Sequence, residues 1–71
     1  MIKSTTSQYD SSTLTSASYN YEHKTLLVHF NHGSYLYKEV ETVDWNLFNL
    51  ATSQGKALNE YIKGKYEFEK V

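Results

Sequence analysis

The sequence predicts an α+β protein: a three-stranded antiparallel β-meander followed by two C-terminal α-helices packed on one face of the sheet. The chain has 71 residues, a length suited to a single domain. Three runs between Leu14 and Glu39 alternate apolar and polar side chains with the period of a strand. After Val40 the apolar residues recur with the spacing of helices, and the C-terminal tail can add a further short strand.

The composition limits how so short a chain can be stabilised. It contains no cysteine, which excludes disulfides and thiolate zinc sites. A domain of this size has a marginal core, so efficient packing of its seven Tyr, three Phe and one Trp, or self-association, must compensate. The net charge of −1 lacks the broad basic field of a general DNA-binding protein.

The ends and the hydropathy suggest where the chain resides. No stretch approaches the ~18 apolar residues of a membrane span, and the start MIKSTTSQYD lacks the apolar segment of a signal peptide. We therefore expect a cytoplasmic protein without membrane contact. Residues 1–11 are polar and rich in Ser and Thr, so we expect a lead-in that is free to be flexible, followed by a single domain over residues 12–71.

The three expected strands pair as two hairpins. If Glu22-His23 and His32-Gly33 are the loop centres, the cross-strand pairs are Tyr19 with Leu26, Ala17 with Val28, Val28 with Tyr37, and Phe30 with Tyr35. The large apolar members of these pairs then fall on one side of the sheet, whereas a one-residue slip would scatter them over both. Gly33 supplies the positive φ that a tight hairpin requires.

The other face of the meander is chemically mixed. It collects Ser16, Ser18, Asn20, Leu27, His29, Leu36 and Lys38. Leu27 and Leu36 beside His29 can form a small contact patch for a protein partner or a second copy. The alternative is that these are two of the scattered exposed leucines that any protein surface carries.

The first helix is expected over residues 43–52, with Thr42 as N-cap and Asp44 in the first turn. It carries two apolar stripes: Val43, Leu47 and Leu50 at i, i+4 and i+7, and Trp45 with Phe48. A surface helix needs only one stripe, so we expect this helix to be covered on two sides. The alternative is an exposed Trp45 that contacts a partner.

A second short helix is expected over residues 56–63. Gly55 interrupts the helical pattern before it, and Leu58, Tyr61 and Ile62 share one face. Gly64 marks its end. The tail KYEFEKV alternates aromatic and charged residues, as a strand or strap would.

No group of residues has the pattern of a catalytic site. Ser53 lacks the G-x-S-x-G elbow of a nucleophile, and neither a Walker A sequence nor G-x-G-x-x-G is present. His23 and His32 fall in loops at opposite ends of the sheet and His29 on a strand, so they do not converge on a metal. We predict that the protein is not an enzyme and holds no metal or cofactor.

The segment ATSQGKALNEYI, residues 51–62, joins the two helices and allows two interpretations. Structurally, Gly55 permits a left-handed or tight turn, Ser53 can cap the second helix, and Asn59 can bond back to the loop. Functionally, free amides at a helix N-terminus, together with nearby lysines, can hold a phosphate. The alternative to this second interpretation is a solvated helix face of mixed charge.

The chain from about Ser11 to Val71 resembles the KTSC domain family, a domain also found at the C-terminus of some lysine–tRNA synthetases. The matching features are SSTLTSASYNYEHKTLLVHF, Gly33 with YLY, Val40, and the ordered set Ala51, Ser53, Gly55, Asn59, Ile62 and Tyr66. Trp45 and Phe48 stand where the family tends to place an aromatic residue and a leucine, which favours their burial. The resemblance implies a small stand-alone module, and the synthetase association makes RNA or nucleotide binding the natural expectation.

Two functions follow from these patterns. The first is a non-catalytic module that binds RNA or a nucleotide-like anionic ligand through the helix junction, with candidate ligand-binding residues Ser53, Gly55, Lys56, Asn59, Tyr61 and Lys63. The second is a protein-interaction or self-assembly module that uses Leu27, His29 and Leu36. An inhibitor of a host process, of the kind that phages carry, could use either surface.

Overall fold

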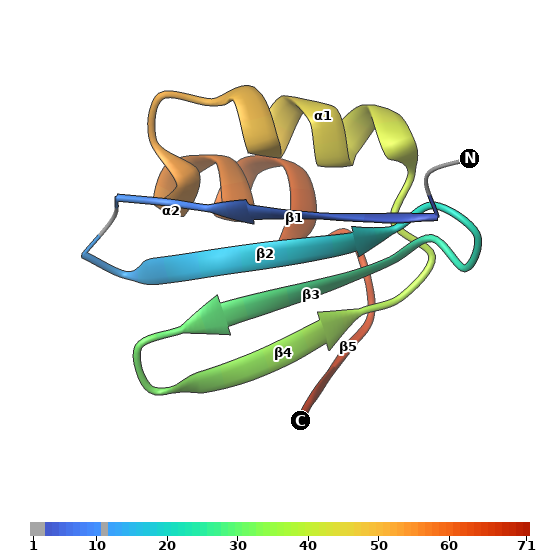
Figure 1. Ribbon diagram of the computed structural model, residues 1–71, viewed down its shortest axis with the longest axis horizontal. Coiled ribbons are helices and arrows are strands. Elements are labelled where there is room, and N and C mark those ends of the chain that lie inside the picture. Colours follow the sequence, from blue (N-terminus) through green and yellow to red (C-terminus); the bar gives the residue numbers. More distant parts are fainter. Residues whose placement is uncertain (1–2, 11) are drawn as a thin grey trace.

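The computed structural model describes residues 3–10 and 12–71 as a five-stranded antiparallel sheet with a helical layer on one face (Figure 1). The elements are β1 (Ser4–Gln8), β2 (Leu14–Asn20), β3 (Thr25–Phe30), β4 (Gly33–Tyr37), α1 (Thr42–Leu50), α2 (Gln54–Ala57), the π-helix η1 (Leu58–Ile62) and β5 (Phe68–Lys70). The strands lie in the sheet in chain order. The predicted α+β class, the meander of β2, β3 and β4 and the short C-terminal strand, β5, are confirmed, and β1 adds a fifth strand at the other edge of the sheet.

β1 is the strand that the sequence did not predict. Its residues, STTSQ, are polar on both faces, so no alternation of apolar side chains marks it. Backbone pairing with β2 holds it, and Tyr9 just beyond it donates a 2.7 Å hydrogen bond to Asn49 on α1. Residues 4–8 of the expected lead-in are therefore part of the sheet, whereas Met1, Ile2 and Ser11 lie outside the described residues.

The first hairpin has the predicted register and the second differs from it. Tyr19 stands opposite Leu26, as expected, but Val28 stands opposite Tyr35 rather than Tyr37. The second loop is Asn31-His32, since Phe30 already pairs with Gly33, and this moves the register by two residues. A shift of two keeps every side chain on its predicted face, so the apolar side of the sheet is unaffected.

The core forms between that apolar side and the helical layer. Its fully buried large side chains are Trp45, Tyr19, Tyr37, Phe48, Leu14, Leu26, Ile62, Val28 and Val40. The Trp45 ring stacks on the Tyr19 ring with centroids 5.3 Å apart and planes 8° apart. Phe48 meets the edge of Tyr9 at 5.6 Å, so α1 packs towards the β1 edge of the sheet (Figure 1). The core interpretation of the Trp45–Phe48 stripe is correct.

The second apolar stripe of α1 remains in solvent. Val43 is 62% exposed, Leu47 45% and Leu50 82%. The expectation that this helix is covered on two sides is therefore wrong for the residues that the structure describes. The second helix packs beside α1 and the tail runs on to pair with β4, so neither passes over the outer face.

The start of α1 also differs slightly from the prediction. The helix begins at Thr42, and Glu41 takes the N-cap position without a side-chain capping bond. The Thr42 hydroxyl lies 3.2 Å from the Tyr19 hydroxyl, which also donates a 2.6 Å hydrogen bond to the Val40 carbonyl. Thr42 therefore tethers the helix to the sheet instead of capping it.

The helical backbone is interrupted between α1 and α2 by two extended residues, Ala51 and Ser53, and not by Gly55. Ala51 has φ −69° and ψ 151°, and Ser53 has φ −129° and ψ 108°. Gly55 lies inside α2 and is not among the residues with positive φ, so the prediction that it interrupts the helix is wrong. Gly64 has φ +83° and follows the last helical turn, as predicted.

Candidate functional site

The helix junction encloses a small surface pocket, here called the junction pocket. It has a volume of about 280 Å³ and is lined by Ala51, Thr52, Ser53, Lys56, Ala57, Glu60 and Tyr61. Ala57 is buried in the core and Ala51 and Tyr61 are partly buried against it, whereas the other lining residues are exposed. The structure thus brings three of the six predicted ligand-binding residues together: Ser53, Lys56 and Tyr61.

The polar groups of the junction pocket are available for a ligand. Ser53 occupies the N-cap position of α2 as predicted, but its side chain makes no capping hydrogen bond. Lys56 is exposed and takes no part in the three ion pairs formed among the described residues. Glu60 also lines the pocket and lowers its affinity for anions, because a carboxylate repels a phosphate.

The other predicted ligand-binding residues lie outside the pocket lining. Asn59 and Lys63 are exposed, and among the described residues Asn59 makes no side-chain hydrogen bond to the loop, contrary to expectation. Gly55 lies next to Lys56, and a Cβ added there would meet nothing within 4 Å. The open space at Gly55 means that packing within the protein does not require a glycine at this position.

The open sheet face carries the predicted partner-binding residues. Leu27 and Leu36 stand opposite each other on β3 and β4, and both are half-buried. His29 Nδ1 lies 2.8 Å from the Ser34 hydroxyl. Thr6 and Ser18 continue the Leu27 row on one side and Glu69 on the other. The two leucines therefore form a short apolar pair within a polar face.

A buried carboxylate links α1 to the segment before β5, and the sequence analysis did not predict this contact. Asp44 is 5% exposed and accepts hydrogen bonds from Lys65 Nζ at 2.7 Å and from the Tyr66 hydroxyl at 2.5 Å. The Tyr66 oxygen in turn accepts a bond from the Glu41 amide. The one sequence signal for this contact is Tyr66, which belongs to the ordered set of the family pattern.

The pKa values of this cluster reflect the contacts. The hydrogen bond from Lys65, and then that from Tyr66, holds the pKa of Asp44 below its ordinary value. The hydrogen bond from Lys65 to Asp44 raises the pKa of Lys65. Burial, and then the hydrogen bond that Tyr66 itself donates to Asp44, raises the pKa of Tyr66. All three shifts favour the ionised Asp44 with both donors protonated, so the cluster acts as a clamp between α1 and the tail.

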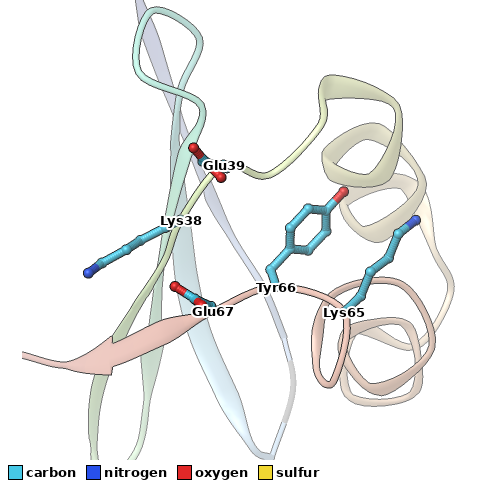
Figure 2. Close-up of a pocket in the computed structure, with 5 residues that line it drawn as sticks. All are labelled: Lys38, Glu39, Lys65, Tyr66 and Glu67. Atoms are coloured by element: carbon cyan, nitrogen blue, oxygen red, sulfur yellow. The ribbon is translucent and has the colours of Figure 1, made fainter.

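A larger surface pocket lies beside this clamp (Figure 2). It has a volume of about 450 Å³ and is lined by Lys38, Glu39, Lys65, Tyr66 and Glu67. The Tyr66 ring points towards the helices, while the side chains of Lys38 and Lys65 extend in opposite directions (Figure 2). Because its charged groups do not converge and two are acidic, this pocket offers no anion site.

Neither a metal centre nor a membrane helix is visible in the described parts of the chain. Within residues 3–10 and 12–71, no three His, Cys, Asp or Glu side chains are grouped as metal ligands. None of the helices in these residues has the length and apolar content to cross a membrane.

The fold and the site define the class: a small α+β domain with a meander sheet, one helical layer and a pocket at the helix junction. The family model described as KTSC domain matches residues 10–66, and the chain belongs to this family. The crystal structure of a KTSC domain protein from Yersinia pestis superimposes with a TM-score of 0.89 at 28% identity, covering 96% of this chain and 97% of that one. No protein in the curated set matches the chain.

Proposed function

We propose that this domain is a non-catalytic module that binds a phosphate-bearing, nucleotide-like ligand in the junction pocket, either free or as one unit of an RNA strand. The observation that carries the proposal is that Ser53, Lys56 and Tyr61 line a single concavity. An ammonium group and a hydroxyl suit a phosphate, and an aromatic ring suits the face of a base.

The size of the pocket limits what it can hold. Its volume of about 280 Å³ lies just below the roughly 300–1,000 Å³ typical of small-molecule sites. It therefore suits one phosphate or one base, and not a dinucleotide cofactor. With one lysine and one glutamate in the lining, we expect weak binding that relies on contacts outside the pocket, such as Lys63 just after η1.

Titration of a fluorescent single-stranded RNA, monitored by anisotropy, tests this proposal. Lys56→Gln should weaken binding, and Glu60→Gln should strengthen it, because each change alters the pocket charge in the opposite direction. Affinity should fall with salt, as expected for phosphate contacts. Lys24→Gln is the matched control, since Lys24 pairs with Glu41. Equal affinity for the Lys56→Gln, Glu60→Gln and unaltered proteins would contradict the proposal.

The second candidate function is protein interaction through the open sheet face. It is supported by the half-buried Leu27–Leu36 pair on the face opposite the helical layer. Leu36→Lys should abolish such an interaction, and His29→Ala should weaken it. If Leu36→Lys changes neither the oligomeric state nor the recovery of a partner, this face is not the interaction surface.

A further inference from the structure

A group of aromatic rings lies on the helix-side face of the sheet, around the β3–β4 hairpin and β5. Ring centroids are 5.2 Å apart for Phe30 and Tyr35, 5.5 Å for Tyr35 and Phe68, and 5.6 Å for Phe30 and His32. Tyr35 stands opposite the buried Val28, which places the group on the same face as the core. These four residues, Phe30, His32, Tyr35 and Phe68, are here called the aromatic platform.

The aromatic platform begins in the core and ends in solvent. Tyr37 is fully buried, whereas Phe68, which stands opposite it on β5 with ring centroids 5.4 Å apart, is 53% exposed. Phe30 and Tyr35 are half-buried and His32 is exposed. The helical layer lies towards β1 and β2, and the hairpin of β3 and β4 extends beyond it (Figure 1). Ring surface is therefore open to a ligand at this end of the sheet.

A lysine lies beside these rings. Lys70 stands opposite Tyr35 in the pairing of β4 with β5, and directly opposed residues share a face of the sheet. A Cβ added at Gly33 would lie 3.5 Å from Lys70 Cε, so the lysine side chain crosses β4 towards the hairpin, where Gly33 pairs with Phe30. Lys70 is exposed and belongs to none of the ion pairs seen in residues 3–10 and 12–71.

The acidic side chain of β5 lies on the other face. Glu69 stands opposite Leu36, which belongs to the open sheet face, and its carboxylate lies 3.8 Å from Lys38 Nζ. Neither β3 nor β4 contains an acidic residue. The three strands that carry the aromatic platform therefore separate their charges by face, and the ammonium group of Lys70 has no carboxylate from these strands beside it.

We propose that the aromatic platform and Lys70 bind single-stranded nucleic acid, with bases stacked on the rings and a phosphate held by Lys70. Every base offers a flat face to an aromatic ring, and the linking phosphate offers the negative charge that an unpaired lysine attracts. A duplex is a poor ligand, because its bases are already stacked on one another. The platform shares no residue with the junction pocket, so this binding does not depend on the function proposed there.

Charge disfavours a second copy of the chain as the occupant. A two-fold interface centred on the platform would bring the Lys70 side chains of both copies together, and like charges at an interface weaken association. A strand of nucleic acid supplies a partner for the rings and for the cation at once. It is therefore the ligand that fits both features of this surface.

Fluorescence anisotropy with a labelled single-stranded RNA of about ten nucleotides tests the role of the rings. Phe68→Leu should weaken binding about 10-fold or more, because leucine keeps an apolar side chain next to Tyr37 but offers no ring face to a base. Phe68→Trp should retain the affinity, since it restores a ring. Circular dichroism checks that both variants are folded. The RNA duplex of the same sequence should bind more weakly than the single strand.

A salt series with the same RNA tests the role of the lysine. Lys70→Gln should weaken binding and lower the slope of log affinity against log salt concentration by about 0.7, the contribution of one phosphate contact on a single strand. Lys38→Gln is the matched control, because it removes the same charge from the other face of the sheet. Phe68→Leu should cause the same fold-loss in the Lys56→Gln background, which separates the platform from the junction pocket.

Three results would overturn the proposal. The first is equal RNA affinity for Phe68→Leu, Lys70→Gln and the unaltered chain, which includes the absence of binding to all three. The second is equal loss with Phe68→Leu and Phe68→Trp while both remain folded, which would mean that no base stacks at this position. The third is self-association of the chain without RNA that Phe68→Leu abolishes in sedimentation equilibrium, which would make the platform a contact between copies.

Discussion

The inner and outer faces of α1 are both apolar at helical spacing, yet only one is buried. Trp45 and Phe48 on the inner face are at most 1% exposed, whereas Leu50 on the outer face is 82% exposed. The inner residues meet Tyr19 and Tyr9, while no element in residues 3–10 and 12–71 packs over the outer ones. The difference shows that periodicity defines which side chains share a face, and that the supply of neighbouring elements decides whether that face becomes core.

The largest expected effect is on the inner face. Trp45→Ala should lower the free energy of unfolding by about 3–5 kcal/mol, because it removes a fully buried ring that stacks on Tyr19. That is a large share of the total stability of a domain this small. Urea denaturation measures the loss, with Leu47→Ala as the matched change on the outer face. Equal losses for the two variants would show that the outer face is also covered.

Asp44, which is buried beside Trp45 in the chain, should also contribute to the stability of the inner face. Asp44→Asn should cost about 1–3 kcal/mol, because a buried carboxylate that accepts two charge-assisted or phenolic hydrogen bonds loses its charge. The pKa of Asp44 is lowered in the folded state, so its contribution is fully present above the unfolded pKa of about 3.9 and is lost as pH falls through the folded value.

Urea denaturation of both proteins between neutral and strongly acidic pH measures this dependence. The wild-type chain should lose more stability than Asp44→Asn as the pH drops below about 4. Parallel curves for the two proteins over that window would mean that the carboxylate is not held ionised by Lys65 and Tyr66.

A substitution at Gly55 tests the stability of the helix junction and its ligand binding separately. Gly55→Ala should raise the free energy of unfolding by about 0.5–1 kcal/mol, because Gly55 is helical and a Cβ there meets nothing within 4 Å. A raised melting temperature with weaker RNA binding would indicate that a ligand approaches the backbone at this position. A lowered melting temperature would show instead that the glycine is needed by the fold.

The smallest expected effect is on the outer face. Leu50→Gln should change the free energy of unfolding by no more than about 0.5 kcal/mol in urea denaturation, because Leu50 is 82% exposed. A large loss of monomer stability would place Leu50 in a core contact.

Local pattern was sufficient for much of the fold. Alternation over Leu14–Asn20 and Thr25–Phe30 predicted strands, and the requirement that Tyr19 and Leu26 share a face predicted their register. The register predicted for the second hairpin was wrong by two residues. Alternation repeats every second residue, so it cannot distinguish registers that differ by two. The face of each side chain was therefore predictable where its cross-strand partner was not.

The candidate site was predicted in part for a similar reason. Ser53, Lys56 and Tyr61 share the junction pocket, but Asn59 in η1 and Lys63, whose backbone is extended after the helix ends, lie outside its lining. The segment from Leu58 to Ile62 is a π-helix, whose wider turns shift side chains away from the spacing expected of an α-helix. The clamp of Lys65 and Tyr66 on Asp44 spans more than twenty residues and leaves no local pattern.

The sequence alone determined the α+β class, the central meander, the apolar side of the sheet and the helical end at Gly64, because each depends on side-chain periodicity or on a residue's own backbone preference. Only the tertiary structure decided that β1 joins the sheet, that Gly55 is helical, and that α1 buries Trp45 and leaves Leu50 in solvent. These depend on backbone hydrogen bonds and on which elements remain to cover a face. Local sequence patterns predict neither the backbone pairing of β1 nor which face of α1 is covered.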